Sequence, residues 1–493
     1  MPRRVSALTP AAYIAPGVTC STNNFPTMAL SSLPPELKLE VAGYLDPAAS
    51  FNFAITCKTA WQLCQPILKE HVRLYAKWRV IGTSQPQTVT WKAVVEILRH
   101  HRGGWYTTEI DLPLYIWQPN TDGADERYID LSEEDQDTLQ AAVRRLRNPR
   151  LEKEQIEDEN QDRVAILERE LARGQFDALL TVLIHHLPNL KTLRLTGSEF
   201  EHRCLELLIW KLAAGQAGFK ETPHLPLLPR LEIAAVSSND TEGCCDARWM
   251  YEFLRLPSLR TFVANGMGGS YDLGDFVSLR SRGMAPMSNV TEVFLERCQF
   301  DSGTLGGIIA GIKALRKFFY YGGGSIVAEG YFYEPKNVIQ ALATHAGHSL
   351  ERLVLEHESL LDDLDEMDLE RVSLRPFKKL AILKCEWRMI WPEEDMELED
   401  SLDQGFHTSD DEPAFDIRSI LPESLQELYL EGTADDVEWD RLTEPFSRPS
   451  DATPHLTKLR IASEGRDVVG SAPRPQAMFD HPLQRLLDGH GYR

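Results

Sequence analysis

Several clusters of side chains in this 493-residue chain have the types that metal binding or catalysis requires. Two adjacent histidines, His185 and His186, precede a Leu-Pro turn, but no second group of ligands follows at metal-binding spacing. Acidic residues are dense from Glu356 to Glu366, yet this stretch lacks the glycine and the alternation of a calcium-binding EF-hand loop. We therefore expect neither a metal nor a cofactor.

The motifs of the common enzyme classes are also missing from the sequence. It contains no phosphate-binding loop G-x-x-x-x-G-K-[ST], no H-E-x-x-H and no G-x-S-x-G. Gly266-Met-Gly-Gly269 and Gly322-Gly-Gly324 are glycine-rich, but they lack the strand–loop–helix context of a dinucleotide site and indicate turns. We predict that the protein has no catalytic residues and is not an enzyme. A hydrolase or transferase hidden in residues 76–180 remains an alternative, and it would show a pocket with clustered titratable groups.

The most informative pattern is a short apolar motif that recurs through the second half of the chain. From residue 187 the short motif L-x-x-L-x-L, with conservative replacements, recurs nine times. Its positions are Leu190/Leu193/Leu195, Leu228/Leu231/Ile233, Leu259/Phe262/Ala264, Val290/Val293/Leu295, Leu315/Phe318/Tyr320, Leu350/Leu353/Leu355, Leu380/Leu383/Cys385, Leu425/Leu428/Leu430 and Leu456/Leu459/Ile461.

This motif predicts a short strand whose last two apolar residues point inward while the residue between them points outward. No unit can bury its apolar side alone, so the units should stack into an α/β solenoid with a curved parallel sheet. The expected outward residues are Arg194, Glu232, Val263, Phe294, Phe319, Val354, Lys384, Tyr429 and Arg460.

The outward residues suggest a binding surface for a protein partner. Exposed apolar side chains aligned on neighbouring strands would form a contiguous patch, which usually marks an interface. Two alternatives stay open: loops of this chain cover the patch, or the strand register is off by one. The predicted partner-binding residues are Val263, Phe294, Phe319, Val354 and Tyr429.

Composition and charge limit the possible partners and the compartment. The net charge of −22 repels phosphate backbones, so we expect no nucleic-acid partner. No run of about 18 apolar residues is present, which predicts no membrane span. Eight scattered cysteines without a C-x-x-C motif are typical of reduced, buried thiols. We expect a cytoplasmic or nuclear protein.

The segment from Leu33 to about Leu74 has the pattern of packed short helices. Pro34-Pro35 suits a first helical turn, and Asp46-Pro47 supplies an N-cap followed by a proline at the first helical position. Too many apolar residues follow for a single helical stripe. A unit of about forty residues can hardly bury them all, so we expect it to need a partner.

This segment resembles the F-box, a motif that begins with Leu-Pro, continues with an apolar helix ending in Leu-Asp, and closes near Cys-Lys and an aromatic residue. The matching residues are Leu33-Pro34-Pro35-Glu36-Leu37, Val41, Tyr44-Leu45-Asp46, Phe51, Cys57-Lys58 and Trp61. The region from residue 187 resembles the divergent leucine-rich repeats that follow the F-box in many fungal-type proteins. Segments such as His348-Ser-Leu-Glu-Arg-Leu-Val-Leu355 are typical of these repeats.

The resemblance implies a substrate receptor of a Skp–cullin–F-box ubiquitin ligase. Its F-box would bind a Skp-type adaptor, and through it a cullin, while the repeats would bind an unknown protein substrate. Ala42-Gly43 replaces a bulkier aliphatic pair that is frequent in the family, which implies weaker binding. The implied adaptor-binding residues are Leu33, Pro34, Leu37, Val41, Leu45 and Phe51.

Two alternatives to this reading stay open. The six residues could instead close the core of the helical unit itself. The protein could also be a leucine-rich-repeat scaffold that acts outside a ligase. The predicted domains are a disordered lead-in (1–31), the F-box (32–75), a connecting region with an aromatic segment and a charged helix (76–183), the repeats (184–465, with an acidic insertion at about 392–414) and a tail or cap (466–493).

Overall fold

The computed structural model describes most of the chain outside its two ends and several internal segments. The predicted lead-in at 1–31 and the acidic insertion at 392–414 lie outside the described residues. The described residues are 33–82, 87–100, 103–113, 132–146, 163–172, 176–196, 204–205, 208–209, 228–238, 244–268, 288–322, 335–357, 372–390, 416–432, 434, 436–448, 452–463 and 466–470.

The chain divides into two compact units, Met1–Val72 and Arg73–Arg493. In the first unit, α1 (Pro35–Tyr44) begins at Pro35, and α2 (Pro47–Ala54) is capped by Asp46, whose Oδ1 accepts a hydrogen bond from the Ala49 N–H at 2.8 Å. Both helix starts were predicted from the sequence. The third helix, α3 (Lys58–Trp78), continues past the boundary into the second unit.

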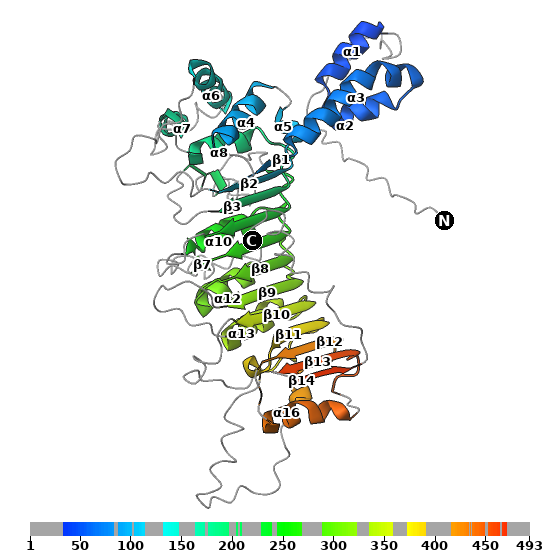
Figure 1. Ribbon diagram of the computed structural model, residues 1–493, viewed down its shortest axis with the longest axis vertical. Coiled ribbons are helices and arrows are strands. Elements are labelled where there is room, and N and C mark those ends of the chain that lie inside the picture. Colours follow the sequence, from blue (N-terminus) through cyan, green and yellow to red (C-terminus); the bar gives the residue numbers. More distant parts are fainter. Residues whose placement is uncertain are drawn as a thin grey trace, which may run out of the picture. The chain divides into compact units, whose positions relative to one another are not determined.

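The second unit is a mixed α/β structure built on one large sheet (Figure 1). Among the described residues this sheet has twelve strands, and their order in the sheet follows their order in the chain. Neighbouring strands are parallel except for the last pair, which is antiparallel. The strands are β1 (Val80–Gly82), β2 (Glu109–Pro113), β3 (Thr192–Thr196), β4 (Ile233–Ser237), β6 (Thr261–Asn265), β8 (Glu292–Glu296), β9 (Lys317–Gly322), β10 (Arg352–His357), β11 (Ile382–Glu386), β12 (Glu427–Glu431), β13 (Lys458–Ser463) and β14 (Arg466–Gly470).

Helices connect many of these strands and cover one face of the sheet. Residues of these helices share a single core with the inward residues of the strands, as Phe253 does with Phe262. Four short elements, β5 (Cys245–Asp246), β7 (Met267–Gly268) and the 3-10 turns Trp387–Met389 and Ile417–Ser419, lie between the main strands. The helices of this unit are α4 (Gln87–Arg99), α5 (Gly103–Tyr106), α6 (Glu133–Leu146), α7 (Arg163–Ala172), α8 (Phe176–His185), α10 (Arg248–Leu254), α12 (Ser302–Ala310), α13 (Pro335–Ala346) and α16 (Asp436–Thr443), with a 3-10 turn at Glu444–Ser447.

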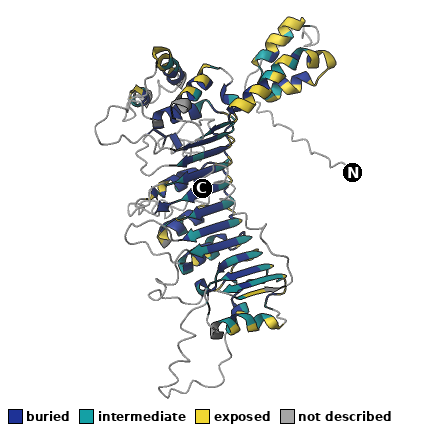
Figure 2. Ribbon diagram, in the orientation of Figure 1, coloured by how far each residue is buried: buried dark blue, intermediate teal, exposed yellow. Residues whose placement is uncertain are grey.

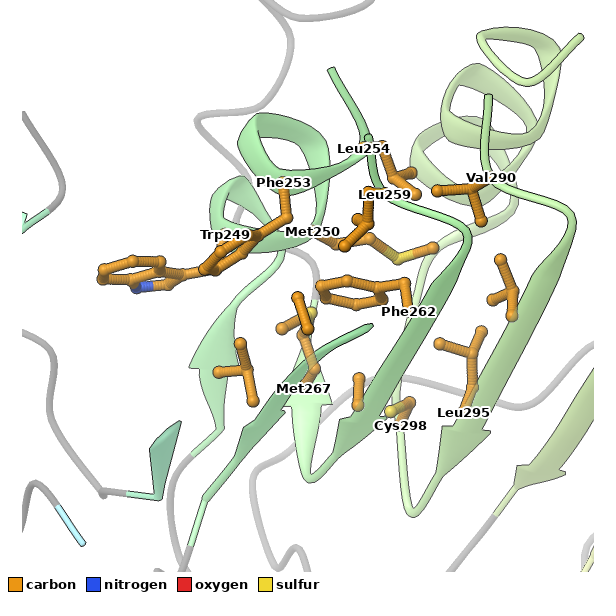
Figure 3. Close-up of a cluster of buried hydrophobic side chains, with 14 of the residues drawn as sticks. Trp249, Met250, Phe253, Leu254, Leu259, Phe262, Met267, Val290, Leu295 and Cys298 are labelled. Carbon is orange, nitrogen blue, oxygen red and sulfur yellow. The ribbon is translucent and has the colours of Figure 1, made fainter. Parts of the chain in front are cut away.

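Figure 3 shows one layer of this core between α10 and the strands below it. The Phe262 ring lies 6.2 Å from the Phe253 ring, and both side chains are fully buried. Met267 and Cys298 are buried beside them. The inward side chain Phe262 of β6 is therefore removed from water by α10, the helix that precedes this strand.

The strand register agrees with eight of the nine predicted motifs and corrects one. Leu193 pairs with Ala234 and Leu195 with Val236, so the outward residue of β4 is Ala235. The predicted outward residue Glu232 lies before the strand. The motif was misplaced by three residues because Leu228 and Leu231 imitate it, while alanine stands at the inward position 234.

The sheet also extends beyond the predicted limits of 184 and 465. Upstream, β1 and β2 join it parallel to β3. Downstream, β14 pairs antiparallel with β13 and occupies the first residues of the predicted tail. β2 lies within the predicted connecting region, and at the start of α6 the Ser132 hydroxyl donates a hydrogen bond to Asp135 Oδ2 at 2.8 Å.

Candidate protein interaction surfaces

The first candidate surface consists of apolar side chains on the helices of the N-terminal unit. Large apolar side chains are exposed to solvent there: Tyr44 is 74% exposed, Phe51 49% and Leu37 46%. Figure 2 shows much of α1–α3 as exposed and the central strands of the large sheet as buried. We call this set the helical apolar surface: Leu37, Leu39, Val41, Tyr44, Phe51, Ile55, Trp61 and Val72.

The unit exposes these residues because its own core is small. Among the residues that the structure describes, that core holds five buried members, namely Ala42, Phe53, Ala54, Ala60 and Cys64, and three of the five are alanines. Leu45, Ile67 and Leu68 are partly buried against it.

A close approach of α1 and α2 explains the small residues. The Ser50 hydroxyl contacts the backbone oxygens of Ala42 and Leu45, each at 3.3 Å, and so ties α2 to the end of α1. The fully buried Ala42 lies at this junction. A small side chain at position 42 is therefore compatible with this junction.

The six residues predicted to bind an adaptor divide into two groups. Pro34, Leu37, Val41 and Phe51 are exposed, as a partner contact requires. Leu33 and Leu45 are half-buried, and Leu45 packs against the small core. The alternative that these residues close the unit's own core therefore fits Leu45 best.

Sequence reasoning missed other members of the helical apolar surface. Leu39, Tyr44, Ile55 and Trp61 are exposed but were not among the predicted contacts. Tyr44 and Trp61 belong to the F-box-like motif, so the sequence did indicate these two residues. Nothing in the sequence pattern separated Ile55 from the buried Phe53 two residues earlier.

The second candidate surface is the face of the large sheet that points away from the helices. Its central row contains a separate apolar cluster of strand residues only: Ala235, Val263, Phe294, Phe319 and Val354. The rings of Phe294 and Phe319 stack with centroids 4.5 Å apart. We call this set the central apolar row. The predicted residues Val263, Phe294, Phe319 and Val354 are thus brought together, side by side and in register.

The central apolar row is not exposed, which corrects the expectation of an open patch. Phe294 is 2% exposed and Phe319 and Val354 are each 5% exposed. Part of the cover comes from neighbouring side chains, because the Arg352 guanidinium lies 5.0 Å from the centre of the Phe319 ring. Tyr429 is also buried, lies outside the cluster, and donates a hydrogen bond from its hydroxyl to Glu427 at 3.0 Å. A partner cannot reach these five residues as the face stands.

Charged residues flank the central apolar row at both ends. Towards the N-terminal end of the sheet, Arg194 pairs with Glu109 and lies 3.9 Å from Asp111. Towards the other end, the Lys384 ammonium lies 2.8 Å from Glu356 and 3.1 Å from Glu431. These pairs compensate buried or half-buried charges within the face.

An acidic row runs beside the central row, at the carboxyl ends of the strands. Register places Glu296 beside Tyr321, Tyr321 beside Glu356, and Glu386 beside Glu431. Neighbouring strands lie about 4.8 Å apart, so Glu386 and Glu431 are direct neighbours, while Tyr321 separates Glu296 from Glu356. We call Glu296, Glu356, Glu386 and Glu431 the acidic row.

Each of the two adjacent histidines that first suggested chemistry contacts the backbone of its own helix region. In His185 and His186 the Nδ1 atoms lie 2.7 and 2.9 Å from the backbone oxygens of Thr181 and Val182, one helical turn earlier. Burial lowers the pKa of His185. Gly266 has a φ of +65°, in line with the predicted turn. Within the described ranges, no three His, Cys, Asp or Glu side chains are placed to hold a metal ion.

Comparison with known proteins assigns the chain to no family. No model of a protein family matches it. No curated protein matches it either. Across the part of the chain that the structure describes, no helix has the length and apolar character needed to cross a membrane.

Glu386 of the acidic row makes the stability of the fold depend on pH. Burial raises the pKa of Glu386 from its ordinary 4.5 to about 6, and Arg388 opposes this only in part. The folded state therefore binds a proton more readily than the unfolded state, so stability falls as pH rises through this window. We expect Glu386→Gln to raise the free energy of unfolding by about 1–2 kcal/mol at pH 8.

Below pH 4.5 the same substitution should have little effect, because Glu386 is then protonated in both states. Chemical denaturation of both chains at pH 8 and at about pH 3 measures the difference. Glu423→Gln is the matched control, since the Glu423 side chain is 76% exposed. An equal gain from the two substitutions at pH 8 would contradict the prediction.

Proposed function

We propose that the protein is the substrate-recognition adaptor of a Skp–cullin–F-box ubiquitin ligase. Residues 33–72 would act as the F-box and bind a Skp-type adaptor, which in turn binds a cullin. The large sheet and its helices would form a leucine-rich-repeat solenoid that binds the protein to be ubiquitinated. Both assignments extend the resemblance of the sequence to these two families.

The helical apolar surface carries this proposal. A unit with a five-residue core exposes eight large apolar side chains, from Leu37 to Val72. Single exposed apolar residues are common on protein surfaces, but such a number on so small a unit is typical of a surface that binds a partner. Its Leu-Pro start, its Leu-Asp pair at Leu45-Asp46 and its Cys57-Lys58 pair favour a Skp-type adaptor as that partner.

The sheet supports the leucine-rich-repeat part of the proposal. Successive units each contribute one strand to a single sheet in chain order, which is typical of stacked repeats. The motif positions Leu353, Leu383 and Leu428 are fully buried and adjacent on neighbouring strands. The last strand, β14, ends the series by reversing direction.

In this proposal the chain performs no covalent chemistry. Ubiquitin transfer would belong to other subunits of the ligase. The chain would contribute proximity, because holding a target near the transfer site raises its effective concentration.

The test is co-purification of the full-length chain with a Skp-type adaptor. We expect Leu37→Asp combined with Phe51→Asp to abolish adaptor binding, because both side chains are about half exposed and a buried unpaired carboxylate at an interface is strongly unfavourable. Binding is measured by isothermal titration calorimetry with purified adaptor.

Glu40→Gln is the matched control, since Glu40 is an exposed polar residue of the same helix α1. Circular dichroism and the thermal midpoint of each variant show whether folding is preserved. If the wild-type chain fails to bind any Skp-type adaptor while remaining folded and soluble, the ligase proposal is wrong. That outcome would favour a repeat scaffold acting outside a ligase.

A further inference from the structure

Exposed cations gather along the edge of the large sheet at which its parallel strands begin. Arg260 directly precedes β6, Lys313 precedes β9, and Lys378 and Lys379 precede β11. Arg230 precedes β4 in the same way, and all five residues are exposed. We call these five residues the basic edge.

The cations of the basic edge have no carboxylate partner. Arg260 Nη1 donates to the backbone oxygens of Pro257 and Asn289, each at 3.2 Å. Lys313 Nζ donates to the side-chain oxygen of the same Asn289 at 2.9 Å. Between residues that the structure describes, no ion pair involves a member of the basic edge. Two positive groups are thus gathered on one uncharged residue.

The carboxylates at the start of the same strands are already paired with other cations. These pairs are Lys191–Glu232 at 3.1 Å, Lys317–Glu292 at 2.8 Å and Arg316–Glu351 at 2.8 Å. Each acid therefore neutralises a cation outside the basic edge, which keeps its own positive charge. The whole chain carries a net charge of −22, so this edge differs in sign from the molecule as a whole. An edge of this kind attracts a negatively charged partner.

We propose that the basic edge binds an extended acidic segment of a partner protein. The exposed ammonium group of Lys313 has three N–H donors, and its contact with Asn289 uses one of them. The guanidinium of Arg260 has five donors, and its recorded contacts all involve Nη1. Both groups therefore keep donors for a carboxylate without losing the contacts that hold them.

The spacing of the cations fits an extended chain. Lys313 and Lys378 occupy the same position of their units, two residues before the first motif leucine. Pro257 occupies this position before β6, and the Arg260 guanidinium contacts it. From β6 to β9 and from β9 to β11 there are two strand spacings each, or about 9.6 Å. Three residues of an extended chain cover about 9.9 Å, so carboxylates at every third position would meet successive cations.

Neighbouring units limit the length of the bound segment. At β10, between the two lysine positions, the equivalent residue is the exposed His348, whose Nε2 lies 3.3 Å from the Lys313 backbone oxygen. At β12 the equivalent residue is Glu423, which lies 3.8 Å from Arg375 and would repel an acidic chain. The stretch from β6 to β11 covers about 19 Å, which is the length of about seven extended residues.

A protein segment fits this edge better than a nucleic acid does. DNA carries one negative charge per about 1.7 Å of its axis, whereas these cations recur only about every 9.6 Å. The acidic row at the opposite ends of the same strands would repel a polyanion that reached beyond the edge. If the sheet binds a target, as the proposed function states, the acidic segment would belong to that target. This consequence rests on the proposed function, whereas the binding itself does not.

Fluorescence anisotropy with the full-length chain tests the proposal. The probe is a labelled nine-residue peptide that repeats the sequence Glu-Gly-Ser three times, measured at low salt so that exposed charges are little screened. We expect the variant Lys313→Glu plus Lys378→Glu to bind this peptide at least about tenfold more weakly than the wild-type chain, because two attractions become repulsions. Circular dichroism shows whether the variant is folded.

Lys58→Glu plus Lys69→Glu is the matched control, since it makes the same change in charge at exposed lysines of α3. We expect its affinity to stay within about twofold of the wild-type value. A peptide with glutamine in place of glutamate should bind none of the chains. Equal weakening by the two variants, no binding of the acidic peptide to the wild-type chain, or tighter binding of a single-stranded oligonucleotide of equal charge would overturn the proposal.

A second measurement locates the contact without any substitution. A carbodiimide joins carboxylates of the bound peptide to nearby lysine amines of the wild-type chain, and mass spectrometry identifies the attached lysines. We expect attachment at Lys313, Lys378 or Lys379, and attachment confined to other lysines would contradict the proposal. If the edge variant does not fold, this result decides. Neither measurement involves a Skp-type adaptor, so the two proposals fail independently.

Discussion

Replacing Phe262 by alanine is expected to lower the free energy of unfolding of the sheet unit by about 3–5 kcal/mol. The Phe262 side chain is fully buried, and its ring lies 6.2 Å from that of Phe253 on α10. Removing it leaves a cavity between the strand and the helix of one layer (Figure 3). Neighbours fixed by strands on both sides can relax only in part, so most of the cavity remains.

Urea denaturation followed by tryptophan fluorescence measures this loss. Trp249 stacks on Phe253 with ring centroids 6.0 Å apart and reports on the same layer. Phe51→Ala deletes the same group from a half-exposed position, and we expect it to cost less than about 1 kcal/mol. If Phe262→Ala left the midpoint unchanged, the layered core described for α10 would be wrong.

The second large effect is expected at Gly104. A Cβ atom built at this position would lie 1.8 Å from the backbone oxygen of His186 and 2.9 Å from its carbonyl carbon. The obstructing atoms belong to the backbone that follows α8, so no side-chain rotation relieves the clash. We expect Gly104→Ala to destabilise the unit by about 3 kcal/mol.

Gly306→Ala is the matched control for this substitution. Gly306 lies within α12, and its added Cβ would meet only the Ala341 Cβ, at 3.7 Å. This is ordinary contact, and alanine favours a helix over glycine, so we expect a gain of about 0.5–1 kcal/mol. Thermal unfolding of both variants should give a lower midpoint for Gly104→Ala and a higher midpoint for Gly306→Ala than for the wild-type chain. A stable Gly104→Ala chain would show that α5 does not pack on the turn after α8.

The strand positions could be predicted because apolar residues in a short parallel strand must alternate. Leu353 and Leu355 are fully buried on one side of β10, and Val354 between them faces the other side, as the motif predicted. The motif gave the wrong position for β4, because Ala234 takes the inward position and the larger Leu231 precedes the strand. The three-residue strand β1 is too short to show any period.

The interaction surfaces were less predictable, because burial of a face depends on what packs against it. The four-residue spacing of Leu37 and Val41 predicts an apolar face on the helix. It does not predict whether a partner or the unit itself covers that face. In the same way, the outward direction of Phe294 and Phe319 follows from alternation, but their burial does not. The positions were therefore predictable and their accessibility was not.

The reversal of the final strand has a consequence for self-association. Every parallel strand from β2 to β12 offers its free amides and carbonyls to the strand that follows. A twelfth parallel strand on β13, supplied by another molecule, would extend the series and open a route to filaments. β14 turns back on β13 and occupies those groups with the chain's own backbone. A strand from another molecule is thereby kept from pairing with β13.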